Sequence, residues 1–232
     1  MHFSHRHIPR LYVASIAEQF NLNAMQTNHL VSVFRLRVGD KFIAFNPKDG
    51  EWECKLNSIS KKLVTANRIS LIKLYQSRNK LYIAFGIIKP DNIKLIIEKC
   101  TELGTTEFFP LIAEYTQYKN INIEKLQTIA IQAVEQSEHM ELPVIHTPMH
   151  LTDFVKQLPD DVVWMTALER SHYAKAEYSG NAGFIIGPEG GFSNEECNLL
   201  ASKTQPISLG EYILRTETAC IACACLNLEK SS

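Results

Sequence analysis

The sequence lacks any uninterrupted apolar stretch that could cross a bilayer. The longest run of apolar residues and glycine is Leu81–Ile88, whereas a transmembrane helix needs about 20 apolar residues. The N-terminal region has no signal-peptide pattern either, because its short apolar stretch is soon followed by the charge of Glu18. We therefore expect a cytoplasmic protein with no membrane partner and no signal peptide.

Cysteine is not abundant, and two common nucleotide-binding motifs are missing. Six cysteines in 232 residues is ordinary usage, and we expect reduced thiols. The chain contains neither the G-x-x-x-x-G-K-[ST] pattern of a P-loop nor a G-x-G-x-x-G pattern in a βαβ unit. It also has no internal repeat or low-complexity tract. Hydrophobic residues make up 45% of the chain, which excludes a disordered or collagen-like protein.

The formal net charge is only −1, which at first sight argues against a nucleic-acid partner. The charge is nevertheless unevenly distributed. Residues 1–80 contain 13 Lys and Arg against 5 Asp and Glu, a formal charge of +8, and the remainder carries −9. This division predicts two units, of which the basic one is suited to contact phosphates. The alternative is a basic domain that docks on its own acidic neighbour.

The basic unit has the pattern of a small β-domain. Strand-like segments at 41–45, 52–56 and 63–66 are separated by turn residues, which is typical of a small barrel. Residues 28–36 are the one stretch with helical periodicity. The polar run 76–80 predicts the boundary between the domains.

From Leu81 onward the pattern changes to strands that alternate with helices. This alternation is typical of an α/β domain with a mainly parallel sheet. We therefore predict a domain at 1–76 and a second at 80–232. The expected strands are 81–88, 108–113, 143–146, 162–167, 183–186 and 206–209; the expected helices are 93–103, 123–137, one opened by the capping box Ser193–Glu196, and one capped by Thr216.

Two unusual loops lie where open α/β sheets bind ligands, after the carboxyl ends of strands. Residues 187–192 (GPEGGF) bring three glycines and a proline, which let the backbone approach a ligand closely. Residues 209–219 (LGEYILRTETA) place an arginine, a glutamate and two threonines at a helix N-terminus. The first loop alone is most often a simple turn. The order and spacing of the two together predict a binding site.

Four further segments complete a pattern that resembles the RsmE-type RNA methyltransferases of the SPOUT class. The resemblance covers nearly the whole chain. The matching segments are 7–13 (HIPRLYV), 29–40 (HLVSVFRLRVGD), 99–104 (KCTELG), 133–137 (AVEQS), 187–192 and 209–219.

The resemblance implies a fold, an activity and a cofactor. The implied fold is a small PUA-like β-barrel followed by an α/β domain with a C-terminal trefoil knot. The implied activity is transfer of the methyl group of S-adenosylmethionine to N3 of one uridine in 16S ribosomal RNA of the small subunit, by a homodimer that needs no metal. The residues implied to line the cofactor pocket are Gly187, Glu189, Gly190, Leu209, Gly210, Ile213, Leu214 and Thr218.

Two residues are the catalytic candidates. Uridine N3 carries a proton, so an enzyme must remove it or stabilise the developing anion. Arg215 can offer planar donors to a carbonyl oxygen or a phosphate, and Glu217 is the nearest carboxylate that could act as base. The alternative for both is a helix-capping ion pair. The candidate RNA contacts are Arg10, Arg35, Arg37, Lys61 and Lys62.

The chain departs from the family pattern at two places, and other functions stay open. Tyr115 stands where the family usually has an arginine, and a second usual arginine is missing near His139. Lower substrate affinity or a shifted target is therefore expected. One alternative function is a non-catalytic RNA-binding or ribosome-assembly factor, and another is methylation of a different RNA base. For the cysteines Cys220, Cys223 and Cys225, core packing is favoured over a metal site.

Overall fold

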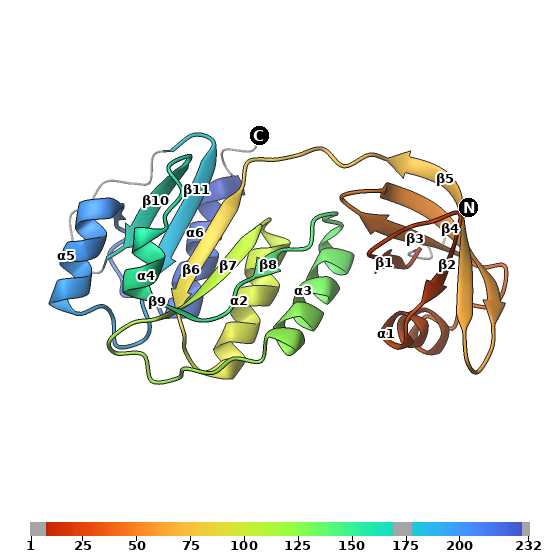
Figure 1. Ribbon diagram of the computed structural model, residues 1–232, viewed down its shortest axis with the longest axis horizontal. Coiled ribbons are helices and arrows are strands. Elements are labelled where there is room, and N and C mark those ends of the chain that lie inside the picture. Colours follow the sequence, from red (N-terminus) through yellow and green to blue (C-terminus); the bar gives the residue numbers. More distant parts are fainter. Residues whose placement is uncertain (1–7, 169–177, 229–232) are drawn as a thin grey trace. The chain divides into compact units, whose positions relative to one another are not determined.

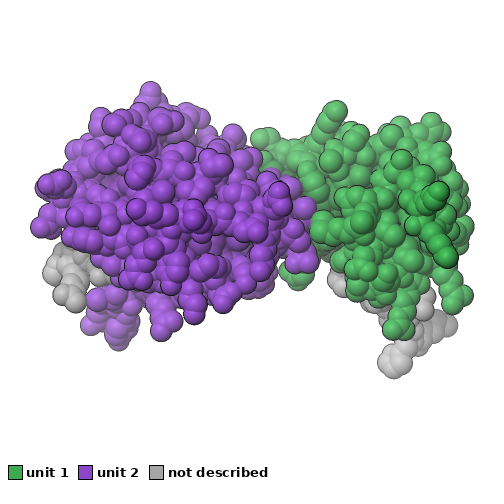
Figure 2. Space-filling view, turned by 60° about the horizontal axis from the view of Figure 1, so that its bottom comes forward, with its two compact units in different colours: residues 1–77, 134–141 green, residues 78–133, 142–232 purple. Residues whose placement is uncertain are grey.

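The computed structural model describes residues 8–168 and 178–228, which fall into two compact units. The first unit contains the described residues up to Ser77 together with Val134–Glu141 (green in Figure 2). The second unit contains Arg78–Ala133 and the described residues from Leu142 onward. No pattern in the sequence indicated that 134–141 groups with the N-terminal unit.

The first unit is built on a five-stranded sheet in the order β1-β3-β4-β5-β2 (Figure 1). β1 is parallel to β3, and the other pairs are antiparallel. The three predicted strands are confirmed as β3, β4 and β5, whereas β1 and β2 were not predicted because they have three and four residues. The bounds are β1 Arg10–Tyr12, β2 Gln19–Leu22, β3 Lys41–Asn46, β4 Gly50–Ile59 and β5 Val64–Lys73.

The predicted helical stretch of this unit begins four residues earlier than expected. A capping box at Asn23 opens the short helix α1, Ala24–Thr27, and a π-helical turn, Asn28–Val33, follows it directly. Leu30 is the residue of this turn that is fully buried in the core of the unit. The apolar periodicity of the sequence correctly indicated that Leu30 contacts the core. The capping residue Asn23, which the periodicity does not include, determines where the helix begins.

The core of the first unit encloses a thiol. Cys54 on β4 is fully buried beside Phe42 and Leu56. Desolvation by burial raises the pKa of the Cys54 thiol to about 12, because the low dielectric of the core disfavours the thiolate. The thiol is therefore protonated and unreactive in the folded unit.

The end of α3 (Ile123–Ser137) brings a buried carboxylate to this unit. Glu135 Oε1 accepts a hydrogen bond from the Tyr12 backbone N–H at 3.0 Å, and its Oε2 lies 4.0 Å from Nε2 of His29. Desolvation raises the pKa of Glu135 from 4.5 to about 7, and desolvation lowers the pKa of His29. Both side chains are thus pushed toward their neutral forms at neutral pH.

Substitution Glu135→Gln should make the protein more stable at alkaline pH. The raised pKa means that ionising the wild-type carboxyl in the folded state costs free energy, and this cost accumulates as the pH rises from about 4.5 to about 7. Glutamine keeps the acceptor for Tyr12 and stays neutral. We expect a gain on the order of 1–3 kcal/mol at pH 8 and little difference at pH 4.5, measured by thermal unfolding. An equal difference at both pH values would contradict this.

The second unit is built on a seven-stranded sheet in which every pair is parallel. The order is β12-β10-β11-β6-β7-β8, and β9 also pairs with β7. This confirms the prediction of an α/β domain. The strands are β6 Leu81–Gly86, β7 Glu107–Ile112, β8 Val144–Ile145, β9 Met149–His150, β10 Val162–Ala167, β11 Asn181–Ile186 and β12 Gln205–Ile207.

Helices cover both faces of this sheet (Figure 1). On one face α2 and α6 pack together over β6 and β11, and on the other α4 and α5 lie over β7 and β10. All six residues of β6 are buried, as expected for a central parallel strand. The helices not yet bounded are α2 Pro90–Glu102, α4 Leu151–Lys156, α5 Asn194–Lys203 and α6 Thr216–Leu228.

The cysteines of α6 support the packing interpretation. Cys220 and Cys223 are fully buried in the core beside Cys100 of α2, and Cys225 is exposed. Burial raises the pKa of all three buried thiols above the ordinary value. Within the described ranges, no group of three His, Cys, Asp or Glu side chains is placed to hold a metal ion.

No helix in the described ranges has the length and apolar character needed to span a membrane.

Candidate active site

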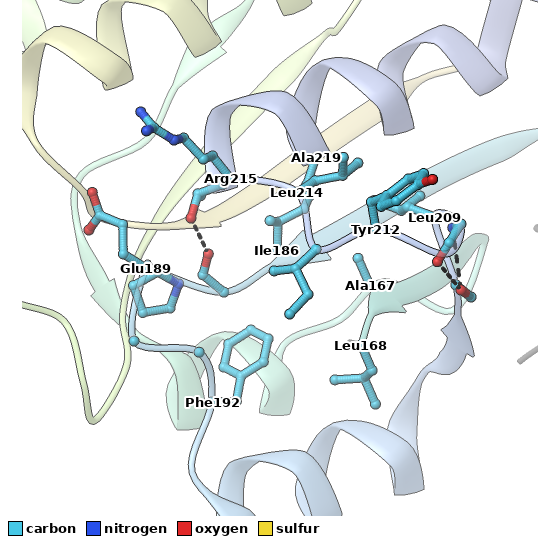
Figure 3. A pocket seen from close by; sticks show the side chains of 18 of the residues that line it. Ala167, Leu168, Ile186, Glu189, Phe192, Leu209, Tyr212, Leu214, Arg215 and Ala219 are labelled. Atoms are coloured by element: carbon cyan, nitrogen blue, oxygen red, sulfur yellow. Dashed lines mark hydrogen bonds between the residues drawn. The ribbon is translucent and has the colours of Figure 1, made fainter. Parts of the chain in front are cut away.

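A cavity of about 650 Å³ opens at the carboxyl edge of the parallel sheet in the second unit. The ends of β10, β11 and β12 contribute to it, together with the start of α6 (Figure 3). Its volume lies in the range of small-molecule sites. The lining residues are Ala167, Leu168, Ile186–Phe192, Cys197, Ser208–Thr216 and Ala219.

The first loop, Gly187–Phe192, is held against the central strand. Pro188 packs on Gly86, the last residue of β6: a Cβ added to Gly86 would lie 2.4 Å from the Pro188 ring nitrogen. The loop then turns back through a hydrogen bond from the Gly191 N–H to the Pro188 carbonyl at 2.8 Å, with Gly191 at φ +72°. Glycine is favoured there because other residues rarely adopt a positive φ.

A hydroxyl bridge joins the two predicted loops. Thr216 Oγ1 donates a hydrogen bond to the Gly187 carbonyl at 2.9 Å (Figure 3). The expectation that Thr216 caps the last helix is therefore wrong: Thr216 is the first residue of α6, and its hydroxyl serves the neighbouring loop. The bridge fixes the spacing of the walls on either side of the cavity.

The cavity combines an apolar middle with a polar end. Figure 3 shows Ile186, Leu214 and Phe192 in the middle and Tyr212 at one end, while Glu189 and Arg215 lie at the other end, with the Arg215 side chain extending away from Ile186. Glu189 and Arg215 are both exposed. Arg215 forms no ion pair and no side-chain hydrogen bond with the described residues. This end can therefore offer a donor fork and a carboxylate to a ligand.

The structure brings most of the predicted pocket residues together. Gly187, Glu189, Gly190, Leu209, Gly210, Ile213, Leu214 and Arg215 all line the cavity. Two of the predicted site residues do not.

Thr218 and Glu217 lie outside the lining of the cavity. Thr218 is exposed, while Glu217 is only 7% exposed and its Oε2 has no hydrogen-bond partner among the described residues. In a helix, consecutive side chains point in different directions, about 100° apart. Arg215, just before the helix, and Thr216 can therefore line the cavity while Glu217 and Thr218 point elsewhere.

The sequence analysis missed several lining residues. Ala167 and Leu168, at the end of β10, lie at the same sheet edge as the two loops. The predicted strand 162–167 implied this position, but Ala167 and Leu168 are small or apolar residues that did not themselves mark a binding site. Tyr212 also lines the cavity and is 80% exposed. Tyr212 belongs to the loop 209–219, which the sequence analysis did identify. An aromatic residue in that loop was the signal that could have indicated Tyr212 as a lining residue.

A buried glutamate links the site to the loop that follows β7. The capping box predicted at Ser193 is confirmed, with Glu196 Oε2 accepting a hydrogen bond from the Ser193 N–H at 3.0 Å. Glu196 Oε1 also accepts a hydrogen bond from the Glu114 N–H at 2.9 Å. The next residue, Tyr115, then lies against the pocket loop: a Cβ added to Gly190 would be 2.8 Å from the Tyr115 Cβ.

The candidate RNA contacts in the first unit occupy different environments. Arg35, Arg37, Lys61 and Lys62 are exposed. Arg10 is only 7% exposed; its Nη1 lies 2.6 Å from Glu51 Oε1 and its guanidinium stacks 4.7 Å from the Phe45 ring centroid. Because the guanidinium of Arg10 is engaged inside the unit, it is not available as a surface contact.

Comparison with known proteins decides the family. The protein-family model described as RNA methyltransferase domain matches residues 75–227, and the family model described as RNA methyltransferase PUA domain matches residues 22–67. The ribosomal RNA small subunit methyltransferase E of Rickettsia conorii is 34% identical over 91% of this chain and 91% of its own. The chain belongs to the ribosomal RNA small subunit methyltransferase E family. The Bacillus subtilis member is 30% identical over 88% of this chain and 87% of its own.

Solved structures agree with membership of the methyltransferase E family. A methyltransferase from Legionella pneumophila, solved with its bound cofactor S-adenosylmethionine, is 28% identical and superposes with a TM-score of 0.82 over 94% of this chain and 96% of that chain. A family member from Neisseria gonorrhoeae, bound to S-adenosyl methionine, has the same fold, with a TM-score of 0.86 and 24% identity over 96% of this chain and 98% of that chain.

Proposed function

We propose that this chain transfers the methyl group of S-adenosylmethionine to N3 of a specific uridine in 16S ribosomal RNA of the small subunit. Its membership of the small-subunit rRNA methyltransferase family supports the RNA substrate. The observation that carries the proposal is the cavity at the sheet edge, with Arg215 and Glu189 at one end of it. A module that only binds RNA has no need of such a pocket, which favours the enzyme over the assembly factor.

The residues of the cavity fit the cofactor. Its apolar middle, with Ile186, Leu214 and Ala219, suits an adenine ring. Glu211 is a lining carboxylate, which suits the positive sulfonium and ammonium groups of S-adenosylmethionine. The glycines of the two loops leave backbone groups accessible for hydrogen bonds. When bound, the cofactor supplies an electrophilic methyl group on sulfur.

The protein's own residues prepare the uridine for attack. Arg215 donates to a uracil carbonyl oxygen, where negative charge develops as N3 loses its proton. Glu189 lies at the same end of the cavity as Arg215, and it accepts that proton. The deprotonated N3 would then be the nucleophile, and the cofactor held between the two loops would supply the methyl group to it. Much of the rate comes from holding N3 in line with the methyl group.

We assign the proton to Glu189 rather than to Glu217, because Glu217 is buried and does not line the cavity. Glu189→Gln should lower kcat by about 10²–10⁴-fold at pH 7, as expected for loss of a general base. The loss should shrink as the pH rises toward the pKa of uridine N3. Rates of methyl transfer to small subunits across pH 6–9 test this.

Glu217→Gln is the matched control, since it makes the same change two residues after Arg215. Its kcat should stay within about threefold of wild type. If instead Glu217→Gln lost activity and Glu189→Gln kept it, Glu217 would be the base.

The wider organisation follows from the same proposal. Residues 1–76 form the RNA-binding domain and 80–232 the catalytic domain with its trefoil knot. Arg35, Arg37, Lys61 and Lys62 contact phosphates, so RNA affinity should fall steeply with salt. The protein acts as a cytoplasmic homodimer.

Mass mapping of modified nucleotides provides the decisive test. Small subunits from a deletion strain should lack one N3-methyluridine, and the purified protein with S-adenosylmethionine should restore it. Calorimetry should show cofactor binding. No cofactor binding would favour the assembly factor, and a methyl group at another atom would favour a different target.

A further inference from the structure

An unassigned aromatic side chain stands beside the pocket. Tyr115 follows β7 and does not line the cavity itself. Its Cβ is so close to Gly190 that a methyl group there would lie 2.8 Å away. Gly190 does line the cavity, directly after Glu189. Tyr115 therefore stands against the pocket loop at the residue that follows Glu189.

The backbone on both sides of Tyr115 is fixed. The Glu114 N–H donates to Glu196 at 2.9 Å, and the Thr116 hydroxyl accepts a hydrogen bond from the Ala113 N–H at 2.8 Å. Thr116, Glu196 and Ala113 are all buried. The loop can therefore present its one intervening side chain in a defined position, which lowers the entropy lost when a ligand binds to it.

The side chain of Tyr115 is about half exposed to solvent, at 48%. It has no hydrogen bond, ion pair or ring contact with a described residue. A tyrosine that served only packing would be buried more deeply or would satisfy its hydroxyl. An aromatic face held rigidly and open beside a pocket is what single-stranded nucleic acids use for base stacking.

We propose that Tyr115 is the stacking platform on which the RNA base lies as the target nucleotide enters the pocket. This inference rests on the proposed function of the site. A base removed from its helix loses stacking energy, and an aromatic side chain at the entrance restores part of it. Arginine can also stack on a base and adds a positive charge. Tyrosine keeps the planar surface without the charge.

The test is a substitution series measured with methyl transfer to small subunits that lack the modification. Tyr115→Ala and Tyr115→Leu should raise KM for RNA by about 5- to 150-fold, the range for loss of one stacked base. Tyr115→Phe should stay within about twofold. The dissociation constant for S-adenosylmethionine should stay within about threefold in all three. Leucine keeps the Cβ and Cγ contact with Gly190, so it separates the aromatic face from packing.

Two additional variants sharpen the result. Tyr118→Ala removes a tyrosine of similar exposure, 38%, three residues further along, and should leave KM within about twofold. Tyr115→Arg should keep a low KM but steepen the dependence of log KM on log salt by about one.

Three outcomes would overturn the proposal. They are a wild-type KM for Tyr115→Leu, an equal loss in Tyr115→Phe and Tyr115→Ala, and a loss of cofactor affinity that parallels the rise in KM. Mapping the methylated atom keeps this test separate from the proposed function. If the methyl group appears at an atom other than uridine N3, that function fails while the KM series still decides the role of Tyr115.

Discussion

Arg215→Ala should reduce methyl transfer by at least about 10²–10³-fold while the affinity for S-adenosylmethionine stays within a few-fold. Arg215 lines the cavity, is exposed, and has no ion-pair or side-chain hydrogen-bond partner among the described residues. Its guanidinium is therefore free to stabilise charge that develops on the substrate, and loss of one such donor typically costs this much in rate. Single-turnover rates at saturating cofactor measure the effect.

The variant Arg215→Lys controls for charge. Lysine keeps the positive charge but not the planar fork, so its rate should fall between those of wild type and Arg215→Ala. The backbone carbonyl of Arg215, which accepts a hydrogen bond from the Ala219 N–H at 2.8 Å, is present in every variant, so α6 should begin normally. Wild-type turnover by Arg215→Ala would exclude the proposed role.

Gly86→Ala should abolish most cofactor binding although Gly86 does not line the cavity. The added methyl group would lie 2.4 Å from the Pro188 ring nitrogen and Cδ, too close for any side chain to be accommodated without movement. Because β6 is central and fully buried, the pocket loop must shift. We expect a dissociation constant at least tenfold higher by calorimetry and a loss of stability of about 1–3 kcal/mol from overpacking.

Gly180→Ala is the matched control for the added methyl group. Gly180 has φ +81°, and a Cβ there would meet no atom of the described residues within 4 Å. Alanine in that backbone conformation should cost about 1–2 kcal/mol of stability and leave cofactor affinity unchanged. Equal cofactor affinities for the two variants would show that Pro188 does not position the pocket loop.

Much of the second unit could be predicted from sequence because its elements are long and locally encoded. The helix 123–137 and the strand 162–167 have the predicted bounds. β9 and α4 were missed: two strand residues and six helical residues carry too little periodicity to be recognised. In the first unit, β1 and β2 are short for the same reason, and their pairing depends on contacts distant in sequence.

The site was predictable in composition but not in geometry. Glycine-rich loops after strands mark a binding edge, and the residues of both loops were found this way. Spacing alone could not show that Glu217 turns away from the cavity or that Arg10 is buried against Glu51. Both depend on helix phase and tertiary packing. Tyr115 reaches the site from a third loop, through the long-range contact of Glu196 with Glu114.

Each unit contains at least one buried cysteine whose rate of chemical labelling reports how often that unit opens. Cys54 lies in the core of the first unit, and Cys220 and Cys223 lie in the core of the second. Since burial keeps these thiols protonated, an alkylating reagent can reach them only when the surrounding unit opens. The order in which the Cys54 and Cys223 side chains become labelled, assigned residue by residue because Cys225 beside Cys223 is exposed, would therefore reveal, in a single experiment on the whole chain, which unit unfolds first.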